Sequence, residues 1–275
     1  MPSDVPANTN GWWCDPSGEY AFLGFSYEVT ACQSLSQLQR EFADIRNNFN
    51  GRYVRLYGAC DGREGFYDDV ITAAWDNNLG VHALIWFGFD GSDQWKTRRD
   101  KLFATLHSNP KAKFVTRVVQ FGSEPLFDGV ISPSELAAQV YSAKQALSDI
   151  DIPITVSELA YGYQIRGGAQ DVLDAIDSIN IHMLPFFARS ASSGDQAWHL
   201  VQKDLGFFIE NEWLAIRPVG ERATAKWSRD RQCKHRIGGG IGWFAHVYAD
   251  DQEPGYGIYT ASRKPKFPFA PKTYC

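Results

Sequence analysis

The stretch VVQFGSEPLFDG, residues 118–129, runs a short apolar segment directly into Gly-Ser-Glu-Pro and then into a polar loop. The apolar segment has the length and composition of a buried strand. Gly122 allows the backbone to bend, and Pro125 ends the hydrogen-bond ladder because it has no N–H group. The stretch therefore places one carboxylate, Glu124, at the point where a strand emerges from the core.

Similar apolar runs recur on both sides of this stretch and alternate with longer amphipathic segments. The runs are YAFLGFSYE, GRYVRLYGA, GVHALIWFGF, FVTRVVQFG, IPITVSELA, SINIHML and GGGIGWFAHVY. Among the amphipathic segments, SLSQLQREFADIRNNF repeats apolar residues at helical spacing after the N-cap candidate Ser34, and SPSELAAQVYSAKQAL has Pro133 in its first turn. Strands separated by helices imply parallel pairing with right-handed crossovers.

The number and spacing of these units predict a (β/α)8 barrel, the TIM-barrel fold. Seven strand runs are clear, and an eighth is expected between SINIHML and GGGIG; eight strand–helix units in about 250 residues match the usual size of this barrel. A doubly wound open sheet is the competing architecture, but it usually carries a phosphate-binding glycine turn, which none of these strand ends has. We expect an N-terminal extension over residues 1–20, a single barrel over residues 21–262 with room for irregularity at its seventh βα unit, and a proline-rich C-terminal strap over residues 263–275.

Composition and charge exclude several classes of function. The net charge is −5 with Lys and Arg scattered, so no basic stripe is present to neutralise nucleic acid. No apolar run approaches the ~20 residues needed to span a bilayer, and residues 1–10 are polar rather than a signal peptide, so we expect no membrane partner. No P-loop, G-x-S-x-G or H-E-x-x-H motif occurs, and we expect neither a cofactor nor a metal.

The cysteines and the aromatic residues give weaker indications. No Cys-x-x-Cys pair suggests a zinc site, and the two terminal cysteines lie where disulfides help a secreted domain; five buried reduced thiols are the alternative. The high aromatic content of 14% fits a bulky core and also a sugar-binding cleft, because pyranose faces stack on flat rings. The five cysteines are Cys14, Cys32, Cys60, Cys233 and Cys275.

Three strand ends carry polar side chains at the face where barrel enzymes place their active sites. Glu124 ends the fourth run, Glu158 the fifth and His182 the sixth. Glycoside hydrolysis by a retaining enzyme needs a protonated acid and a second carboxylate about 5–5.5 Å away, which two strand ends can supply. Structural roles are the alternatives: Glu124 pairing with an Arg, Glu158 capping a loop, and His182 as a satisfied core histidine.

Four segments resemble a known family. RVVQFGSEPLFDG, IPITVSELAYGY, INIHMLPFF and GGGIGWFAHVYADDQEPGYGIY are similar to secreted fungal, especially basidiomycete, proteins related to glycoside hydrolase family 17, the β-1,3-glucanases. The resemblance covers most of residues 14–206 and 238–275. It implies a (β/α)8 barrel and retaining hydrolysis or transglycosylation of β-glucan, with an acid/base Glu on the fourth strand and a nucleophilic Glu on the seventh. Glu124 falls on the acid/base position.

The chain departs from this family at the acid/base motif. Related barrels usually carry Asn-Glu there, and the Asn side chain hydrogen-bonds the sugar 2-hydroxyl near the anomeric centre. Ser123 takes the place of that Asn. The corresponding hydrogen bond is therefore expected to be shorter in reach, mediated by water or absent.

The seventh-strand segment departs further, because the family pattern resembles Glu-Asn-Gly-Trp-Pro and this chain reads LGFFIENEWLAIRPVGERATAKWSRDRQCKHRIGGG. Glu210 begins a match at three of four positions and is the first candidate nucleophile; in this reading Gly206 caps the preceding helix and FFIE is the strand. In the rival reading the helix continues through Phe208, EWLAIRPVG is the strand and Glu221 reaches the catalytic face. Pro218 argues against that reading because a central strand needs its N–H group. A third reading places no carboxylate correctly.

The same topology predicts the residues that line the cleft. Strand alternation lets only some of them point inward, and the others would face the surrounding helices. We expect Tyr27, Tyr57 and Trp243 to be the main sugar platforms. The full set of predicted substrate-binding residues is Tyr27, Arg55, Tyr57, Trp86, Glu158, Tyr161, His182 and Trp243.

Two functions follow. The first is a retaining glycoside hydrolase or glucan transglycosylase that acts on the β-1,3-linked glucan of fungal-type cell walls, with Glu124 as acid/base and Glu210, or alternatively Glu221, as nucleophile. The second is a barrel that binds glucan without cleaving it because the seventh-strand nucleophile is lost. In both cases we expect a secreted monomer, located outside the cell or in the cell wall, whose partner is a β-glucan polysaccharide or oligosaccharide.

Overall fold

The computed structural model describes residues 1–14, 19, 21–185, 192–210, 242–251 and 253–273. Its centre is a seven-stranded sheet with the order β6-β5-β4-β3-β2-β1-β7, in which every neighbouring pair is parallel. The strands are β1 (Ala21–Glu28), β2 (Tyr53–Tyr57), β3 (Gly80–Ile85), β4 (Thr116–Ser123), β5 (Ile154–Leu159), β6 (Ser178–His182) and β7 (Gly242–Ala245).

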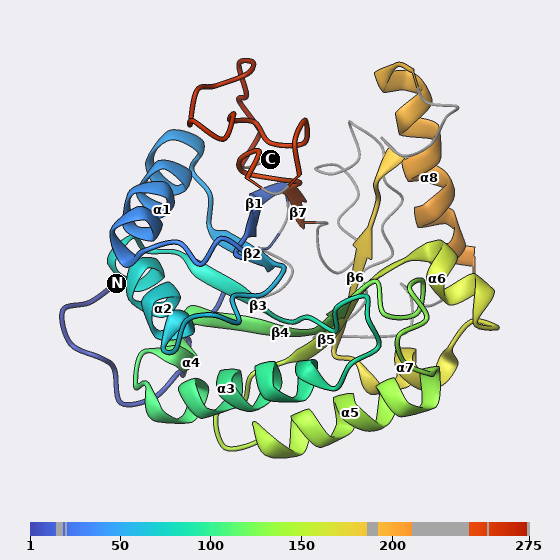
Figure 1. Ribbon diagram of the computed structural model, residues 1–275, viewed down its shortest axis with the longest axis horizontal. Helices are drawn as coiled ribbons and strands as arrows, with labels where there is room; N and C mark the ends of the chain where they lie inside the picture. Colours follow the sequence, from blue (N-terminus) through green and yellow to red (C-terminus); the bar gives the residue numbers. More distant parts are fainter. Residues whose placement is uncertain (15–18, 20, 186–191, 211–241, 252, 274–275) are drawn as a thin grey trace.

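Helices connect consecutive strands and lie around the outside of the curled sheet (Figure 1). They are α1 (Leu35–Phe49), α2 (Phe66–Asp76), α3 (Gln94–Ser108), α4 (Ala112–Val115), α5 (Pro133–Ala146), α6 (Ala160–Ile165), α7 (Gln170–Ala175) and α8 (Gly194–Glu210). Alternating βα units around a parallel sheet confirm the expected (β/α)8 class. The seven strand runs of the sequence correspond to the seven strands.

Local sequence signals explain where two of the helices start. The Ser34 side chain accepts a hydrogen bond from the backbone N–H of Gln37 and caps α1, as its position predicts. Ser132 and Glu135 form a reciprocal capping box at the start of α5, whose first residue is Pro133. Helix α1 then buries Leu38, Phe42 and Ile45, which are spaced along one helical face.

The prediction that FFIE, residues 207–210, forms the seventh strand is wrong, because these residues form the last turn of α8. Leu205 and Phe208, three residues apart, are both buried, and the Phe208 ring packs edge-on against Tyr163 of α6 at 5.6 Å between ring centroids. This helical spacing of apolar contacts explains why the helix passes through Gly206. The rival strand EWLAIRPVG lies outside the described residues.

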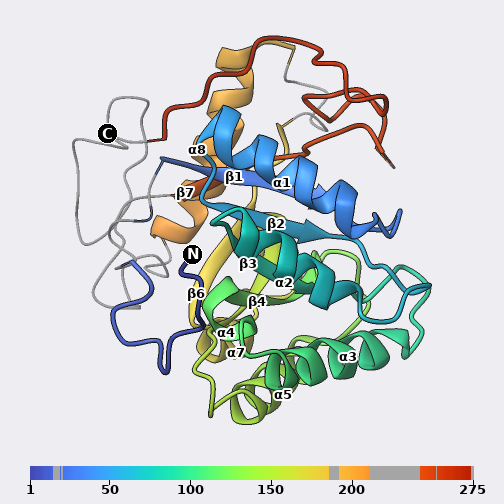
Figure 2. The same ribbon diagram turned by 90° about the vertical axis from the view of Figure 1, so that its left-hand side faces the viewer.

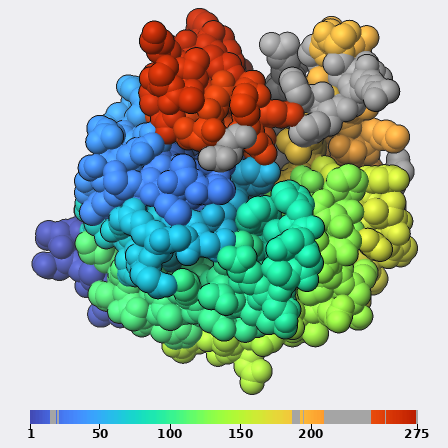
Figure 3. All heavy atoms as spheres, viewed as in Figure 1, coloured from blue at the N-terminus to red at the C-terminus, as the bar shows by residue number. Residues whose placement is uncertain are grey.

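Segments near both termini pack on the barrel. The Trp12 ring lies parallel to Trp75 of α2, and its indole N–H donates to the Phe114 carbonyl at 2.7 Å. Phe269 packs against aromatic rings of β1 and α1, and Figure 2 shows the C-terminal segment running along α1. In the space-filling view this segment, in red, lies directly against the blue atoms of the N-terminal part of the chain (Figure 3).

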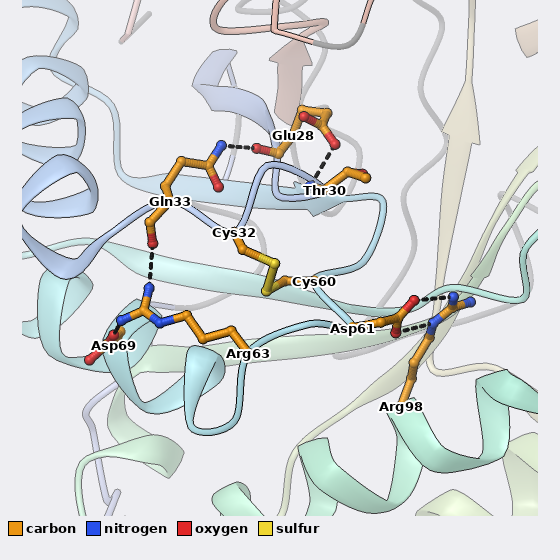
Figure 4. The surroundings of a disulfide bond; sticks show 9 residues. All are labelled: Glu28, Thr30, Cys32, Gln33, Cys60, Asp61, Arg63, Asp69 and Arg98. Carbon is orange, nitrogen blue, oxygen red and sulfur yellow. Dashed lines mark hydrogen bonds and ion pairs between the residues drawn. A yellow bond between two sulfur atoms is a disulfide. The ribbon is translucent and has the colours of Figure 1, made fainter.

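One disulfide joins two loops at the carboxyl ends of neighbouring strands. Cys32 follows β1 and Cys60 follows β2, and their Cα atoms are 5.0 Å apart. Figure 4 shows the disulfide with Gln33 next to Cys32 and Asp61 next to Cys60. The Gln33 side chain donates a hydrogen bond to the Glu28 carbonyl. The disulfide excludes the alternative of five reduced cysteines. Within the described residues Cys14 is a free, exposed thiol, whereas Cys233 and Cys275 lie outside them.

Candidate active site

Polar side chains from five strands meet on the concave side of the sheet. The Gln120 side-chain oxygen, on β4, accepts hydrogen bonds from Arg55 of β2 at 2.7 Å, Ser157 of β5 at 2.6 Å and Asn180 of β6 at 3.0 Å. Arg55 also donates to Ser26 of β1 at 3.2 Å. Bonds between strands that are not neighbours require these side chains to point into the barrel, where they form a buried polar layer beneath its mouth.

Glu124 lies above this layer, directly after β4. Its φ of 58° is left-handed, which is uncommon for a residue with a side chain. Its N–H donates to the Ser157 carbonyl at 2.7 Å, and its own carbonyl accepts from the N–H of Asp128 at 2.9 Å. The backbone is thus held from both sides, and strain held in this way is typical of functional positions.

His182, at the end of β6, connects the Glu124 carboxylate to Arg55. Its Nδ1 lies 2.6 Å from Glu124 Oε1, and its Nε2 lies 2.5 Å from Arg55 Nη2. A guanidinium can only donate, so Nε2 is the acceptor and Nδ1 carries the hydrogen that is donated to Glu124. Burial, followed by the charge of Arg55, lowers the pKa of His182 to about 4. The ring is therefore neutral at neutral pH.

Arg55 is a buried cation, and no carboxylate among the described residues is hydrogen-bonded to it directly. Burial lowers its pKa to about 10, so the guanidinium is still charged at neutral pH. The nearby Glu124 charge opposes that lowering. His182 therefore links a buried positive charge to the Glu124 carboxylate.

A second group of polar side chains lies where β2 and β7 end. The Tyr57 hydroxyl donates to Glu253 Oε1 at 2.8 Å, and His246 Nε2 lies 2.9 Å from Glu253 Oε2. The hydrogen bond with His246 lowers the pKa of Glu253. Tyr57 also packs edge-on against His246, with 5.2 Å between ring centroids. Tyr57 is thus half-buried at the mouth, where a sugar platform is expected.

Comparison with known proteins agrees with this architecture. The sequence matches no protein-family model and no curated protein. The structure is similar to the glycoside hydrolase family 17 β-1,3-glucanosyltransferase from Rhizomucor miehei, with a TM-score of 0.62, 14% identity, and 89% of this chain and 95% of that chain covered. An active-site mutant of the Rhizomucor miehei β-1,3-glucanosyltransferase in complex with laminaritriose gives a TM-score of 0.63, 15% identity and the same coverage.

A β-glucosidase from Thermotoga maritima is more distant, with a TM-score of 0.51, 10% identity, and 85% of this chain and 84% of that chain covered. The fold is the barrel of these glycoside hydrolases. Identities this low show the shared fold and no more.

Three predicted substrate-binding residues do not face the mouth. Tyr27 is buried against Phe42 of α1 and donates a hydrogen bond to Glu41, because its side chain points to the face opposite that of the inward Ser26. Trp243 packs edge-on against Phe22 and Phe269, under the C-terminal segment. The expectation that these two rings are sugar platforms is therefore wrong.

Glu158 is the third correction. Its side chain is fully buried, and its two oxygens accept hydrogen bonds from backbone N–H groups, at 2.7 Å from Leu126 and 2.8 Å from Leu159. Burial raises its pKa to about 8. A substrate cannot reach this carboxyl group, which instead has the loop-capping role that was its structural alternative.

The remaining predicted residues occupy different places. Trp86, half-buried after β3, lies under the Arg98 guanidinium at 5.0 Å, and its carbonyl accepts from the same side chain. Tyr161 is exposed on α6. Glu210 is the last residue of α8 rather than the end of a strand, and Glu221 lies outside the described residues.

The sequence reading missed the polar layer and one acidic neighbour. Partial burial and the Glu124 charge raise the pKa of the Asp128 carboxyl to about 6, although the residue as a whole is exposed. The interior polar residues had a visible signal, because a Ser, Gln or Asn interrupts the apolar run of β1, β4, β5 and β6 and side chains of a strand alternate between its two faces. The residues overlooked are Ser26, Gln120, Asp128, Ser157, Asn180 and Glu253.

Two further searches cover the described residues. No group of three or more His, Cys, Asp or Glu side chains among them is arranged to hold a metal ion. None of their helices combines the length and the apolar composition needed to cross a membrane.

Proposed function

We propose that this protein is a retaining glycoside hydrolase or glucan transglycosylase that acts on β-1,3-linked glucan, with Glu124 as the acid/base. The observation that carries the proposal is the Glu124 carboxylate at the carboxyl end of β4, with Oε1 held by the neutral His182. No described residue hydrogen-bonds its Oε2, which is therefore the oxygen that transfers the proton. The fold shared with a β-1,3-glucanosyltransferase supports the same assignment.

In the proposed first step, Oε2 of protonated Glu124 gives its proton to the leaving glycosidic oxygen. A second carboxylate attacks the anomeric carbon from the opposite face and forms a glycosyl-enzyme. Glu124, now ionised, then takes a proton from water in hydrolysis or from a sugar hydroxyl in transfer, while the oxygen of that group bonds to the anomeric carbon and displaces the second carboxylate. Its charge at this stage is stabilised by the His182 Nδ1–H and by the buried Arg55 behind it.

The second carboxylate has two candidates, Glu210 and Glu221. Helix α8 continues through Phe208 to Glu210. The prediction that Glu221 is the nucleophile requires the helix to continue through Phe208, so that the seventh strand follows it. The observed course of α8 meets this requirement. It supports Glu221 over Glu210.

The proposed substrate is a neutral glucan of the type found in fungal cell walls. The Rhizomucor miehei enzyme in complex with laminaritriose shares this fold. The Cys32–Cys60 disulfide supports a site of action outside the cell, because such bonds persist in oxidising compartments. We expect a monomer, which size-exclusion chromatography with light scattering would test.

The test of catalysis combines turnover with covalent labelling. Glu124→Gln should abolish both the release of reducing ends from laminarin and the formation of shorter or longer products from laminarioligosaccharides, whereas the control Asp100→Asn, an exposed carboxylate on α3, should not. A 2-deoxy-2-fluoro glucoside should label one Glu, and peptide mapping should distinguish Glu210 from Glu221. Unchanged rates in Glu124→Gln would remove Glu124 from the mechanism.

The alternative is a barrel that binds glucan without cleaving it. The course of α8 supports this alternative, because residues 207–210 are helical and the strand expected to present Glu210 does not form there. Affinity electrophoresis in laminarin gels separates the two functions. Retarded migration together with no change in the chain lengths of laminarioligosaccharides and no label would establish the binding function and overturn the catalytic one.

A further inference from the structure

An exposed aromatic pair lies beside the candidate active site. Phe127, in the loop after β4, and Tyr161, on α6, have exposed fractions of 42% and 57%. Their ring centroids are 6.2 Å apart and their planes make an angle of 60°. Large apolar side chains grouped on a surface typically mark a binding site, whereas isolated ones do not.

The pair is placed close to Glu124 by the backbone. The N–H of Asp128 donates to the Glu124 carbonyl at 2.9 Å, so Phe127 lies within a single closed turn that starts at Glu124. Arg166, at the end of α6, donates to the Leu126 carbonyl at 3.0 Å and ties the same turn to the helix that carries Tyr161.

The buried Glu158 carboxyl connects the two halves of the pair. Its Oε2 accepts hydrogen bonds from the N–H groups of Leu126 at 2.7 Å and Phe127 at 3.3 Å. Its Oε1 accepts from the N–H of Leu159 at 2.8 Å, one residue before α6 begins. A Cβ on Gly162 would lie 2.3 Å from Oε1, so only glycine leaves room for the carboxyl group at this point of α6. The Glu158 side chain thus holds the turn that carries Phe127 next to the start of α6, the helix that carries Tyr161.

We propose that Phe127 and Tyr161 form a subsite that stacks one neutral glucose unit of a β-glucan chain next to the bond at Glu124, and that Glu158 is its positioning residue. The identity of the sugar rests on the proposed function. The C–H faces of a pyranose pack on aromatic rings, and two rings at 60° can contact a sugar on two sides. The Glu124 and Asp128 carboxylates beside the pair favour a neutral sugar over a uronic acid.

The test measures binding in a background without turnover. Laminaripentaose is titrated calorimetrically into Glu124→Gln, alone and combined with Phe127→Ala or Tyr161→Ala. Each substitution should weaken binding by about 3- to 10-fold, which is the range expected for the loss of one aromatic contact. Tyr141→Ala removes an equally exposed ring (53%) from α5 and should leave the affinity unchanged. Changes below twofold for both Phe127→Ala and Tyr161→Ala would overturn the subsite.

The positioning role of Glu158 is tested by a double-mutant cycle. Glu158→Gln keeps the side-chain volume and one acceptor oxygen but puts an amide N–H₂ group where an acceptor is needed. It should weaken pentaose binding in the same direction as Phe127→Ala, and the combined variant should bind no more weakly than about the weaker single variant. Additive losses would show that Glu158 acts independently of the pair and would overturn its role. Circular dichroism of each variant checks folding.

The outcomes separate this proposal from the proposed function. Pentaose binding that depends on Phe127 and Tyr161, in a protein that forms neither shorter nor longer products from laminarioligosaccharides, keeps the subsite and overturns catalysis. Turnover together with pentaose binding that is insensitive to both substitutions keeps catalysis and overturns the subsite. No binding of laminaripentaose overturns both.

Discussion

The hydrogen bonds of His182 allow a single arrangement of its protons. Arg55 donates to Nε2, so the ring hydrogen lies on Nδ1 and points to Glu124. Because burial and the Arg55 charge lower the pKa of His182 to about 4, we expect nitrogen NMR to show a neutral Nδ1–H ring down to about pH 5. His107, exposed on α3 with its pKa raised by a bond to the Phe103 carbonyl, should charge well above that pH and serves as the internal control. A His182 ring that charges together with His107 would contradict the assignment.

Glu158 should make stability depend on pH. Burial raises its pKa to about 8, so the folded protein holds this proton over a range in which the unfolded chain, with an ordinary pKa of 4.5, has released it. The stabilisation is fully present below about pH 4.5 and is lost as pH rises to about 8.

Urea unfolding of wild type and Glu158→Gln across this range checks the effect. The free energy of unfolding of the wild type should fall relative to that of the variant, by up to about 1.4 kcal/mol per pH unit. Glu64→Gln, an exposed carboxylate, should show no such trend against the wild type. A constant difference between wild type and Glu158→Gln would show that Glu158 is ionised throughout.

At the scale of elements, the loops that follow β1 and β2 act as one unit. The Cys32–Cys60 bond joins them across 28 residues, and Arg63 of the second loop donates to the Gln33 carbonyl of the first at 2.6 Å. Asp61 of the second loop also pairs with Arg98 of α3 (Figure 4). The Arg98 guanidinium in turn lies over the Trp86 ring. The rim of the mouth on this side is therefore cross-linked from β1 to α3.

Removal of the disulfide should loosen this rim. Cys32→Ser/Cys60→Ser should lower the free energy of unfolding by about 2–4 kcal/mol, because the unfolded chain gains the entropy of an open loop. Cys14→Ser, which changes a free exposed thiol, should have no measurable effect. Urea denaturation of the three proteins makes the comparison, and equal midpoints would contradict the stabilising role of the bond.

Helix α8 illustrates what sequence patterns predict at this scale. Capping signals such as Ser34 and the Ser132 box are local, so they located the starts of α1 and α5. The end of α8 has no such signal. Gly206 resembles a helix terminator, but the helix continues through it because the buried Phe208 ring packs against Tyr163 of α6. That contact joins residues far apart in sequence and is invisible to a local pattern.

At the scale of the whole molecule, the C-terminal segment seals the side of the barrel where β1 and β7 meet. Phe269 contacts Phe22, Phe25, Phe49 and Trp243, and the Lys272 carbonyl accepts from the Phe22 N–H at 3.0 Å. Phe269→Ala should therefore lower the free energy of unfolding by about 2–4 kcal/mol, as expected for a large side chain packed between elements. Phe267→Ala, which removes a ring that is 50% exposed, should cost much less. Equal losses in thermal or urea unfolding would contradict this packing.

The sequence by itself determined the fold class, the strand order along the chain and the position of Glu124. Strand and helix periods, turn residues and caps are properties of neighbouring residues, and a parallel βα repeat then forces every strand's carboxyl end, with its polar residue, to the same side. Glu124, Tyr57 and His182 were placed at the mouth for this reason.

Only the tertiary structure decided which side chains face inward and what each one contacts. A shift of one residue along a strand exchanges its two faces, so the sequence pattern alone does not decide which residues point inward. In the structure Tyr27 faces α1 and Trp243 faces the C-terminal segment, whereas Arg55 points into the barrel. The Glu158 role likewise depends on the loop after β4 meeting α6. These contacts join residues distant in sequence, and the free energy of such contacts depends on the packed three-dimensional arrangement rather than on any local pattern.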